Sequence, residues 1–136
     1  MDNSVPIQSV KRAIPLTFAR KIKRGGEKKS RICVQGFRLI KDLDYGDSYS
    51  PTIEWEAIRL LFAIGASRRM RRHSCDHRNA FCQTEMPEDQ RFHVRVPQRY
   101  REYDEHGNEL VYPLLMSLYG TVQAALLWYE NCKTGL

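Results

Sequence analysis

The chain has 136 residues, of which 42% are hydrophobic and 28% are charged. This composition is typical of a globular protein, so disorder throughout the chain is excluded, and the length allows one ordinary domain with a sizeable core. No apolar stretch approaches the about 20 residues that cross a bilayer, and the chain does not start with a signal-peptide pattern. We therefore expect an intracellular, cytoplasmic protein that is not secreted and has no membrane partner.

The positive charge is concentrated at the start of the chain. Residues 1–41 contain 11 Lys and Arg against 2 Asp and Glu, a balance of +9, whereas residues 42–136 contain 11 against 14, a balance of −3. Such an asymmetry suggests a surface that faces phosphates, since neutralising phosphates releases condensed counterions. A solvated basic face with no ligand is the alternative interpretation.

The first predicted element is a basic β-hairpin over residues 17–38. Residues 17–24 alternate apolar and basic positions, Gly25 and Gly26 favour a turn, and a β-branched apolar run follows. Residues 1–16 show no sustained periodicity and are interpreted as a lead-in arm. Residues 38–51 are acidic and rich in turn formers, which indicates a loop.

A helix is predicted after this loop. Ile58, Leu61, Phe62 and Gly65 recur at helical spacing, with acidic residues before them and arginines after them. We expect this helix to pack beneath a sheet that contains a strand over residues 72–76.

Short strands and a second helix are predicted for the remainder. Strands are expected over residues 91–97 and 109–120, the latter ending in a turn at Gly120, with a surface loop between them. Residues 121–132 predict a helix that continues to the end of the chain. The order of elements predicts an α+β fold with a mixed or antiparallel sheet and packing helices.

Four segments from Phe18 onward carry a family resemblance: SRICVQGF, LDYGDSYSPTIEWEAIRLLFAIGAS, CDHRNAF and SLYGTVQAALLWYE. Their order and intervals resemble the reverse transcriptase of Ty1/copia-type retrotransposon polyproteins. The resemblance implies a right-hand polymerase, with a fingers-like hairpin and loop over residues 17–52 and a partial palm over residues 53–136.

The resemblance places the metal-binding carboxylate of this family at Asp76. Nucleotide addition is a phosphoryl transfer, in which Mg²⁺ held by carboxylates activates the primer 3′-hydroxyl and stabilises the leaving pyrophosphate. The implied partners are an RNA template, a DNA primer and deoxynucleoside triphosphates. A lone Asp at a strand end is otherwise a turn residue or a cap.

The resemblance also implies a set of substrate-binding residues. Phe81 matches the aromatic ring beneath the incoming sugar, where it would exclude a 2′-hydroxyl. Asn79 and Ala80 match a turn whose amides approach the triphosphate, and Arg31 matches a fingers cation. Gly120 and Gln123 match the turn that supports the nucleotide and the template base.

Some positions depart from the family pattern. The family has LYGLKQAPRAWY, and this chain differs from it at Thr121, Val122, Ala125, Leu126 and Leu127. Two cations are thereby lost, and Gln35 replaces a third. The sequence contains no Asp-Asp pair, so the family's Tyr-x-Asp-Asp hairpin is expected beyond residue 136. We therefore expect a fragment that does not extend a primer alone and that self-associates through an exposed sheet edge.

Two other interpretations stay open. His73, Cys75 and His77 alternate along the predicted strand, with Cys82 nearby, which is a weak pattern for zinc. The second alternative is a non-enzymatic remnant of a decayed element that still binds nucleic acid through the basic hairpin. The four cysteines are otherwise expected to be reduced.

Overall fold

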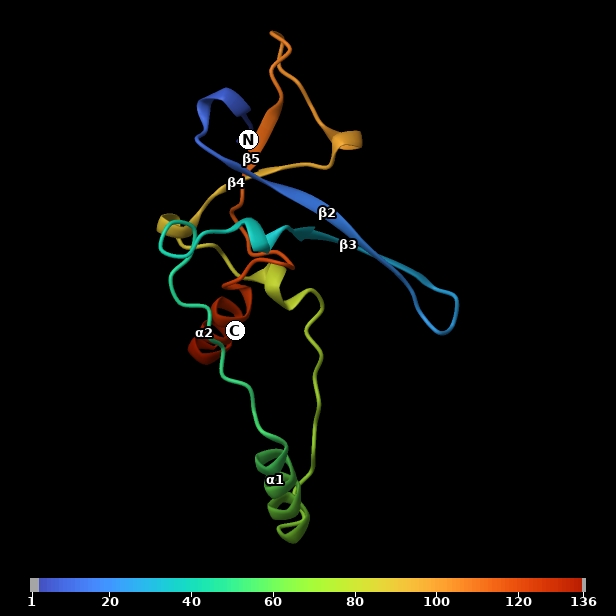
Figure 1. Ribbon diagram of the computed structural model, residues 1–136. Coiled ribbons are helices and arrows are strands. Elements are labelled where there is room, and N and C mark those ends of the chain that lie inside the picture. The colour runs from blue at the N-terminus through green and yellow to red at the C-terminus, as the bar shows by residue number, and fades with distance from the viewer. Residues whose placement is uncertain (1–2, 136) are drawn as a thin grey trace.

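The computed structural model describes residues 3–135, which form one five-stranded sheet and two α-helices (Figure 1). The strands lie in the order β1-β5-β4-β2-β3. Their bounds are Val5–Pro6 for β1, Ala13–Ile22 for β2, Lys28–Val34 for β3, His93–Arg95 for β4 and Leu110–Pro113 for β5. The helices are α1, Trp55–Ser67, and α2, Ala124–Thr134.

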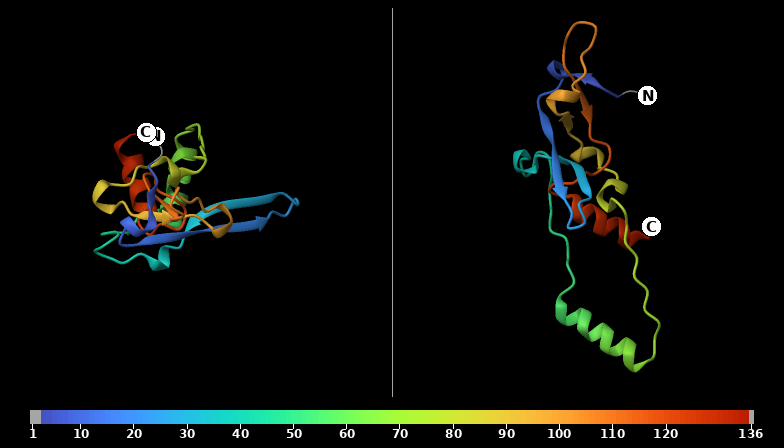
Figure 2. Two further views of the ribbon diagram at one scale, coloured as in Figure 1. Left: turned by 90° about the horizontal axis from the view of Figure 1, so that it is seen from above. Right: turned by 90° about the vertical axis from the view of Figure 1, so that its right-hand side faces the viewer.

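The predicted basic hairpin is confirmed as the antiparallel pair of β2 and β3, in register from Leu16 opposite Val34 to Ile22 opposite Lys28. Gly26 takes a φ of 80° in the connecting turn, a conformation that glycine adopts without strain. The end of the hairpin projects from the body of the molecule as a two-stranded arm (Figures 1 and 2).

The sheet is mixed, as predicted. β2 pairs with β4 in parallel, whereas the β4–β5 and β1–β5 pairs are antiparallel. β2 begins at Ala13, four residues before the predicted hairpin, and its Ile14 is in the core. The segment interpreted as a lead-in arm therefore contributes β1 and the start of β2 to the sheet; residues 1–2 lie outside the described residues.

The hydrophobic core lies where β2, β4 and the β3 end meet α2. Its buried members are Ile14, Val34, Leu39, Met86, Phe92, Val94, Leu114 and Leu127. α2 ends at Thr134 and is followed by Gly135 with a φ of 88°. The prediction that this helix continues through the end of the chain was wrong, because Gly135 takes a positive φ that no residue within an α-helix adopts.

The helix predicted over residues 52–69 forms as α1, but its predicted packing was wrong. α1 lies apart from the sheet, joined to the body by two extended segments (Figures 1 and 2). Residues 72–76 form no strand. The segment Arg71–Asp76 has no apolar face with which to enter a core, since it contains two arginines, a histidine and an aspartate.

The remaining connections are irregular. The predicted buried strand over residues 109–120 is limited to β5, with one isolated bridge between Glu85 and Met116 beyond it. The predicted loop over residues 38–51 is confirmed. Among the helices of the described chain, none is long and apolar enough to cross a membrane.

Candidate functional site

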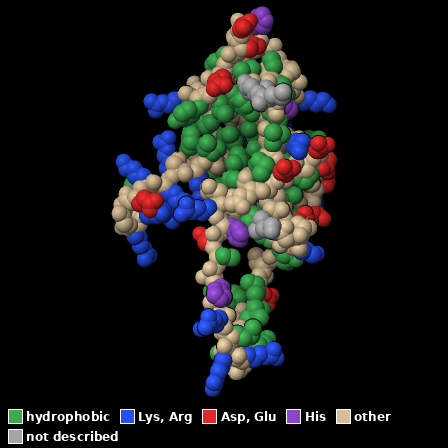
Figure 3. Space-filling view, turned by 180° about the vertical axis from the view of Figure 1, so that it is seen from behind, with side chains coloured by type: hydrophobic (Ala, Val, Ile, Leu, Met, Phe, Trp, Pro, Cys, Tyr) green, Lys and Arg blue, Asp and Glu red, His purple; other side chains and the backbone are tan. Residues whose placement is uncertain are grey.

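A polar cavity of about 520 Å³ lies between the basic hairpin and the segment that follows α1. It is lined by Lys23, Glu27, Lys29, Arg31, Asp76, His77, Arg78, Asn79 and Tyr119, which we call the hairpin groove. Lys and Arg side chains gather over the hairpin beside it (Figure 3). The groove therefore places a group of cations opposite a segment that carries one carboxylate.

The strand pleat selects which hairpin cations face the groove. Side chains two positions apart on a strand point to the same face, so Lys29 and Arg31 of β3 line the groove together. Lys28, the first residue of β3, lies on the other face, where it lines a separate pocket with Arg20; Lys29 borders that pocket as well as the groove. At the turn, Lys23 pairs with Glu27 at 2.6 Å, so the groove's second carboxylate already has a cation.

The opposite wall is a tight turn at Asn79. Asn79 has a φ of 51°, a left-handed conformation that asparagine tolerates better than most residues, and its carbonyl accepts a hydrogen bond from the Cys82 amide at 2.8 Å. The Gln83 side chain donates to the Arg78 carbonyl at 2.7 Å. A short 3₁₀ helix, Ala80–Gln83, follows. A turn is thus present where the resemblance places Asn79 and Ala80, although no strand precedes it.

Tyr119 joins the two walls of the groove. The Arg31 guanidinium lies 4.9 Å from the centre of the Tyr119 ring, a cation–π contact, and the Phe81 ring meets Tyr119 edge-to-face at 5.4 Å. The Val34 amide donates to the Tyr119 carbonyl at 2.8 Å. Phe81 therefore reaches the groove through Tyr119 and does not itself line it.

Gly120 is required next to Tyr119 because the chain passes against β3 there. Its φ is 88°, and a Cβ placed on it would lie 2.2 Å from the Val34 carbonyl oxygen. A Cβ on Gly36 would in turn lie 2.0 Å from the Gly120 carbonyl oxygen. These two glycines let the Tyr119 turn dock on the hairpin base, which fixes the position of the tyrosine ring.

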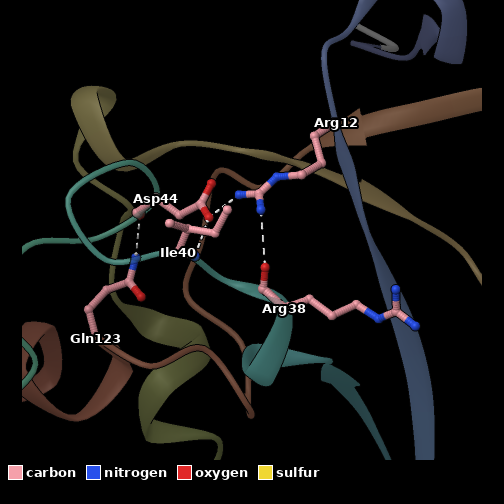
Figure 4. A network of polar contacts seen from close by, with 5 residues as sticks. All are labelled: Arg12, Arg38, Ile40, Asp44 and Gln123. Atoms are coloured by element: carbon pink, nitrogen blue, oxygen red, sulfur yellow. Dashed lines mark hydrogen bonds and ion pairs between the residues drawn. The ribbon is translucent and has the colours of Figure 1, made fainter.

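Gln123 lies away from the groove. It is fully buried at the start of α2, and its side-chain amide donates to the Asp44 carbonyl at 3.3 Å (Figure 4). The Asp44 carboxylate forms an ion pair with Arg12 and accepts a hydrogen bond from the Ile40 amide at 2.7 Å. Arg12 also donates to the Arg38 carbonyl at 3.1 Å. Gln123 therefore contacts the loop after β3, which this network attaches to β2 and α2.

Several of the positions that depart from the family pattern contribute to packing. Leu127 is a core residue, and Val122 packs against the core. Thr121 is buried. Gln35 accepts a hydrogen bond from the Arg38 side chain at 2.8 Å. Apolar and neutral side chains at these positions are compatible with this interior, where a cation would need a partner.

The described residues do not form a magnesium site by themselves. Mg²⁺ prefers carboxylate, phosphate and water oxygens, and in the groove Asp76 is the one carboxylate that is not held by a lysine. No group of three His, Cys, Asp or Glu that can hold a metal occurs within residues 3–135. The same finding removes support from the zinc alternative, in which Cys75 and His77 approach each other only to 4.0 Å.

The structure thus brings Arg31, Asp76 and Asn79 into one groove. Ala80, Phe81 and Gly120 lie next to groove residues without lining the groove, and Gln123 is buried away from it. Sequence reasoning did not identify Lys23, Lys29, His77, Arg78 and Tyr119 as groove residues. Two signals in the sequence identify some of them. The strand period links Lys29 to Arg31, and Tyr119 precedes the glycine of the Leu-Tyr-Gly motif.

Comparison with known proteins identifies a matching family and several relatives of this chain. The family model described as "Reverse transcriptase (RNA-dependent DNA polymerase)" matches residues 3–136. The chain is 26% identical over 130 residues to the "Retrovirus-related Pol polyprotein from transposon TNT 1-94" of Nicotiana tabacum, covering 92% of this chain and 10% of that protein.

Two relatives come from Arabidopsis thaliana. The chain is 28% and 30% identical to the "Retrovirus-related Pol polyprotein" from transposons RE2 and RE1, over 108 residues in each case, 79% of this chain and 7% of each relative. The chain therefore spans a tenth or less of the length of the curated relatives it matches. No solved structure matches the chain.

Proposed function

This chain belongs to the reverse transcriptase (RNA-dependent DNA polymerase) family, which confirms the resemblance found in its sequence, and we propose that its hairpin groove binds the phosphates of a nucleic acid or of an incoming nucleotide. One observation carries this proposal. Lys23, Lys29 and Arg31 line the groove opposite Asp76 and Asn79, the residues that match the family's catalytic turn. The implied partners are an RNA template, a DNA primer and deoxynucleoside triphosphates.

We assign the roles within this proposal as follows. Arg31, Asn79 and Ala80 contact phosphate oxygens, since a guanidinium and turn amides both donate to anions. Phe81 excludes a 2′-hydroxyl through the Tyr119 ring against which it packs. Gly120 and the buried Gln123 support the nucleotide and the template base indirectly, by holding the Tyr119 turn and the loop after β3. In the longer polyprotein, the hairpin belongs to the fingers and residues 53–136 to the palm.

The proposal is tested by changing one face of β3 at a time. The variant Lys29→Ala/Arg31→Ala removes two cations from the groove, and the control Arg20→Ala/Lys28→Ala removes two from the opposite face. Binding to a labelled RNA–DNA primer–template is measured by fluorescence anisotropy over a series of salt concentrations. We expect the groove variant to weaken binding by about 10-fold or more and to reduce the salt slope by about 2, because each phosphate contact contributes roughly one unit.

The control is expected to bind nearly as the native chain does. Equal losses in both variants would show that a diffuse basic surface binds the nucleic acid and that the groove has no special role. Unchanged binding in both variants would contradict the proposal entirely.

A non-enzymatic nucleic-acid-binding remnant is the second candidate. It is favoured by the pairing of Glu27 with Lys23, which leaves Asp76 as the groove's one available carboxylate. Asp76 would supply a single ligand to a magnesium site whose other ligands come from the longer protein, so we expect no primer extension by this chain with Mg²⁺. Template-directed extension by the purified chain would overturn this expectation.

A further inference from the structure

The segment that connects α1 to the hairpin groove carries a second concentration of positive charge. Residues 68–78 contain five arginines against one aspartate, and every residue of this segment is exposed. Four of the arginines follow α1 directly, and we call them the arginine cluster: Arg68, Arg69, Arg71 and Arg72. The fifth, Arg78, lines the hairpin groove. No ion pair within residues 3–135 includes any of the five, so their charge is not neutralised in the described chain.

The end of α1 fixes where the arginine cluster lies. Arg69 takes a φ of 52°, its amide donates to the Ala66 carbonyl at 3.1 Å, and the Met70 amide donates to the Gly65 carbonyl at 2.8 Å. These bonds form a Schellman motif, which ends the helix in a defined turn. Arg72 is held further by its guanidinium, which lies 5.2 Å from the centre of the Phe62 ring. This contact keeps the charge of the guanidinium, which retains N–H donors for phosphate oxygens.

The backbone leads from the arginine cluster to the hairpin groove. Residues 70–77 return from α1 to the body as one extended segment, which ends in the Asn79 turn at the wall of the groove (Figures 1 and 2). Lys and Arg side chains gather over the hairpin and again at the α1 end of the molecule (Figure 3). Arg72 and Arg78 are six residues apart, so their Cα atoms are separated by at most about 20 Å. This distance corresponds to about six nucleotides at about 3.4 Å each along a strand.

We propose that the arginine cluster is a second phosphate-binding site, which a nucleic-acid strand reaches by continuing from the hairpin groove along residues 72–78. The occupant is a phosphodiester backbone because the arginine cluster is continuous with the groove and because guanidinium groups bind phosphate oxygens in pairs. A strand that reaches both sites binds more tightly than a short one, since its second contact is intramolecular. The inference rests on the proposed function, because the groove holds one part of the strand.

The first test compares oligothymidylates of two lengths by fluorescence anisotropy. A probe of about 5 nucleotides cannot reach both sites at once, whereas one of about 20 nucleotides can. Arg71→Gln/Arg72→Gln should weaken binding of the long probe by about 10-fold or more and reduce its salt slope by about 1.4, since each phosphate contact on a single strand contributes about 0.7. Binding of the short probe should stay within about 3-fold of the native value.

Two matched variants control for charge. Lys11→Gln/Arg99→Gln removes the same charge from the segments before β2 and after β4, at the end of the body away from α1 (Figure 1). It should leave the binding of both probes within about 3-fold of the native values, because neither segment lies on the path of the strand. Arg71→Lys/Arg72→Lys keeps the charge and should retain most of the affinity for the long probe.

The second test locates the bound strand. Trypsin cleavage within residues 68–72 should slow several-fold when the long probe is bound and should not change with the short probe, because only a strand that lies on the arginine cluster covers these peptide bonds. The same concentrations of both probes are compared at saturation of the groove. Cleavage that the long probe leaves unchanged would overturn the inference.

The remaining outcomes separate this inference from the proposed function. Equal losses for the two probes in Arg71→Gln/Arg72→Gln, or no loss for either, would overturn the inference and leave the groove proposal standing if Lys29→Ala/Arg31→Ala still weakens binding. Binding that depends on the arginine cluster but not on Lys29 and Arg31 would contradict both. Phosphatidylserine vesicles that bind the arginine cluster and are not displaced by the long probe would identify a membrane surface as its ligand and overturn the inference.

Discussion

The contact between Gly120 and Val34 shows how single residues position the hairpin groove. Tyr119 carries the ring that meets both Arg31 and Phe81, and its place depends on the neighbouring glycine lying against the β3 backbone. The family motif that suggests a nucleotide-supporting role for Gly120 therefore has a structural cause in this chain. A larger residue at position 120 would displace the Tyr119 turn, and thereby the groove wall, even with no ligand bound.

Gly120→Ala is expected to destabilise the fold more than Gly107→Ala. Both glycines have positive φ, 88° and 78°, so both substitutions carry a backbone strain of about 1–2 kcal/mol. Only Gly120 would place its new Cβ against backbone, whereas Gly107 has open space around it. We expect a total loss of about 3 kcal/mol or more for Gly120→Ala, since overpacking adds about 1–3 kcal/mol. Urea denaturation measures both values, and equal losses would contradict the close approach.

A second residue-scale feature is the ion-pair cluster around Glu109, just before β5. The Glu109 carboxylate accepts hydrogen bonds from the Arg95 guanidinium, one of them at 2.5 Å, and lies 3.2 Å from Arg101. The hydrogen bond from Arg95, assisted by the charges of both arginines, lowers the pKa of Glu109 and outweighs its desolvation. The same hydrogen bond raises the pKa of Arg95. The cluster attaches the loop after β4 to the sheet.

The Glu109 cluster predicts a stability that falls in acid. Because the folded pKa lies below the ordinary value of 4.5, the stabilisation is present above pH 4.5 and is lost as the pH falls through the lowered pKa. Glu109→Gln should cost about 1–2 kcal/mol at neutral pH, since a hydrogen bond to a charged group contributes about that much when one partner, here Arg95, is partly exposed to water.

The measurement is the free energy of unfolding of both proteins from pH 7 to pH 3. The difference between native chain and Glu109→Gln should shrink as the pH falls below 4.5. A difference that stays constant over this range would show that Glu109 titrates as it does in the unfolded chain.

Elements with local signals were predictable from the sequence. The hairpin has alternating residues and a Gly-Gly turn, and α1 has helical spacing with charges that suit its dipole, so both were found within a few residues of their observed bounds. The start of β2 was missed because Ala13 and Ile14 join the sheet through β4, more than 70 positions further along the chain. Pairing at that distance leaves no local pattern.

The segment over residues 72–76 marks the limit of this reasoning. Its strand was inferred from its place between a helix and a family motif, and its own residues offer no apolar face. The groove residues Arg31, Asp76 and Asn79 were predicted through the motif, yet the central position of Tyr119 required the docking of two glycines that only the structure shows. Local patterns thus predicted elements, while packing determined which of them meet.

Limited trypsin digestion should cut first within residues 68–72. This segment holds four arginines, is exposed and forms no strand or α-helix after α1 ends at Ser67. Lys28, Lys29 and Arg31 are equally exposed, but their backbone is paired with β2 and must open before it can be cleaved. Mass spectrometry of a digestion time course identifies the order of cuts. Earlier cleavage inside β3 would show that the hairpin is less stable than the α1 connection.

At the scale of the molecule, the chain separates a basic arm from an apolar arm. The hairpin carries most of the excess charge of residues 1–41, and α1 carries much of the exposed apolar surface at a different place on the body (Figures 1 and 3). The small sheet and α2 connect the two. The two arms therefore differ both in their surface chemistry and in their position on the body.

The displaced position of α1 predicts an extended molecule in solution. A compact domain of 136 residues has a radius of gyration of about 14 Å. We expect small-angle X-ray scattering of the chain at low concentration to give a clearly larger value, because α1 stands away from the body (Figure 2). Replacing residues 53–72 by a short Gly-Ser linker should lower the radius by much more than the about 1 Å expected from shortening a compact chain. A radius near about 14 Å for the chain, unchanged by the linker beyond that about 1 Å, would mean that α1 folds back onto the sheet, which would then cover its apolar face.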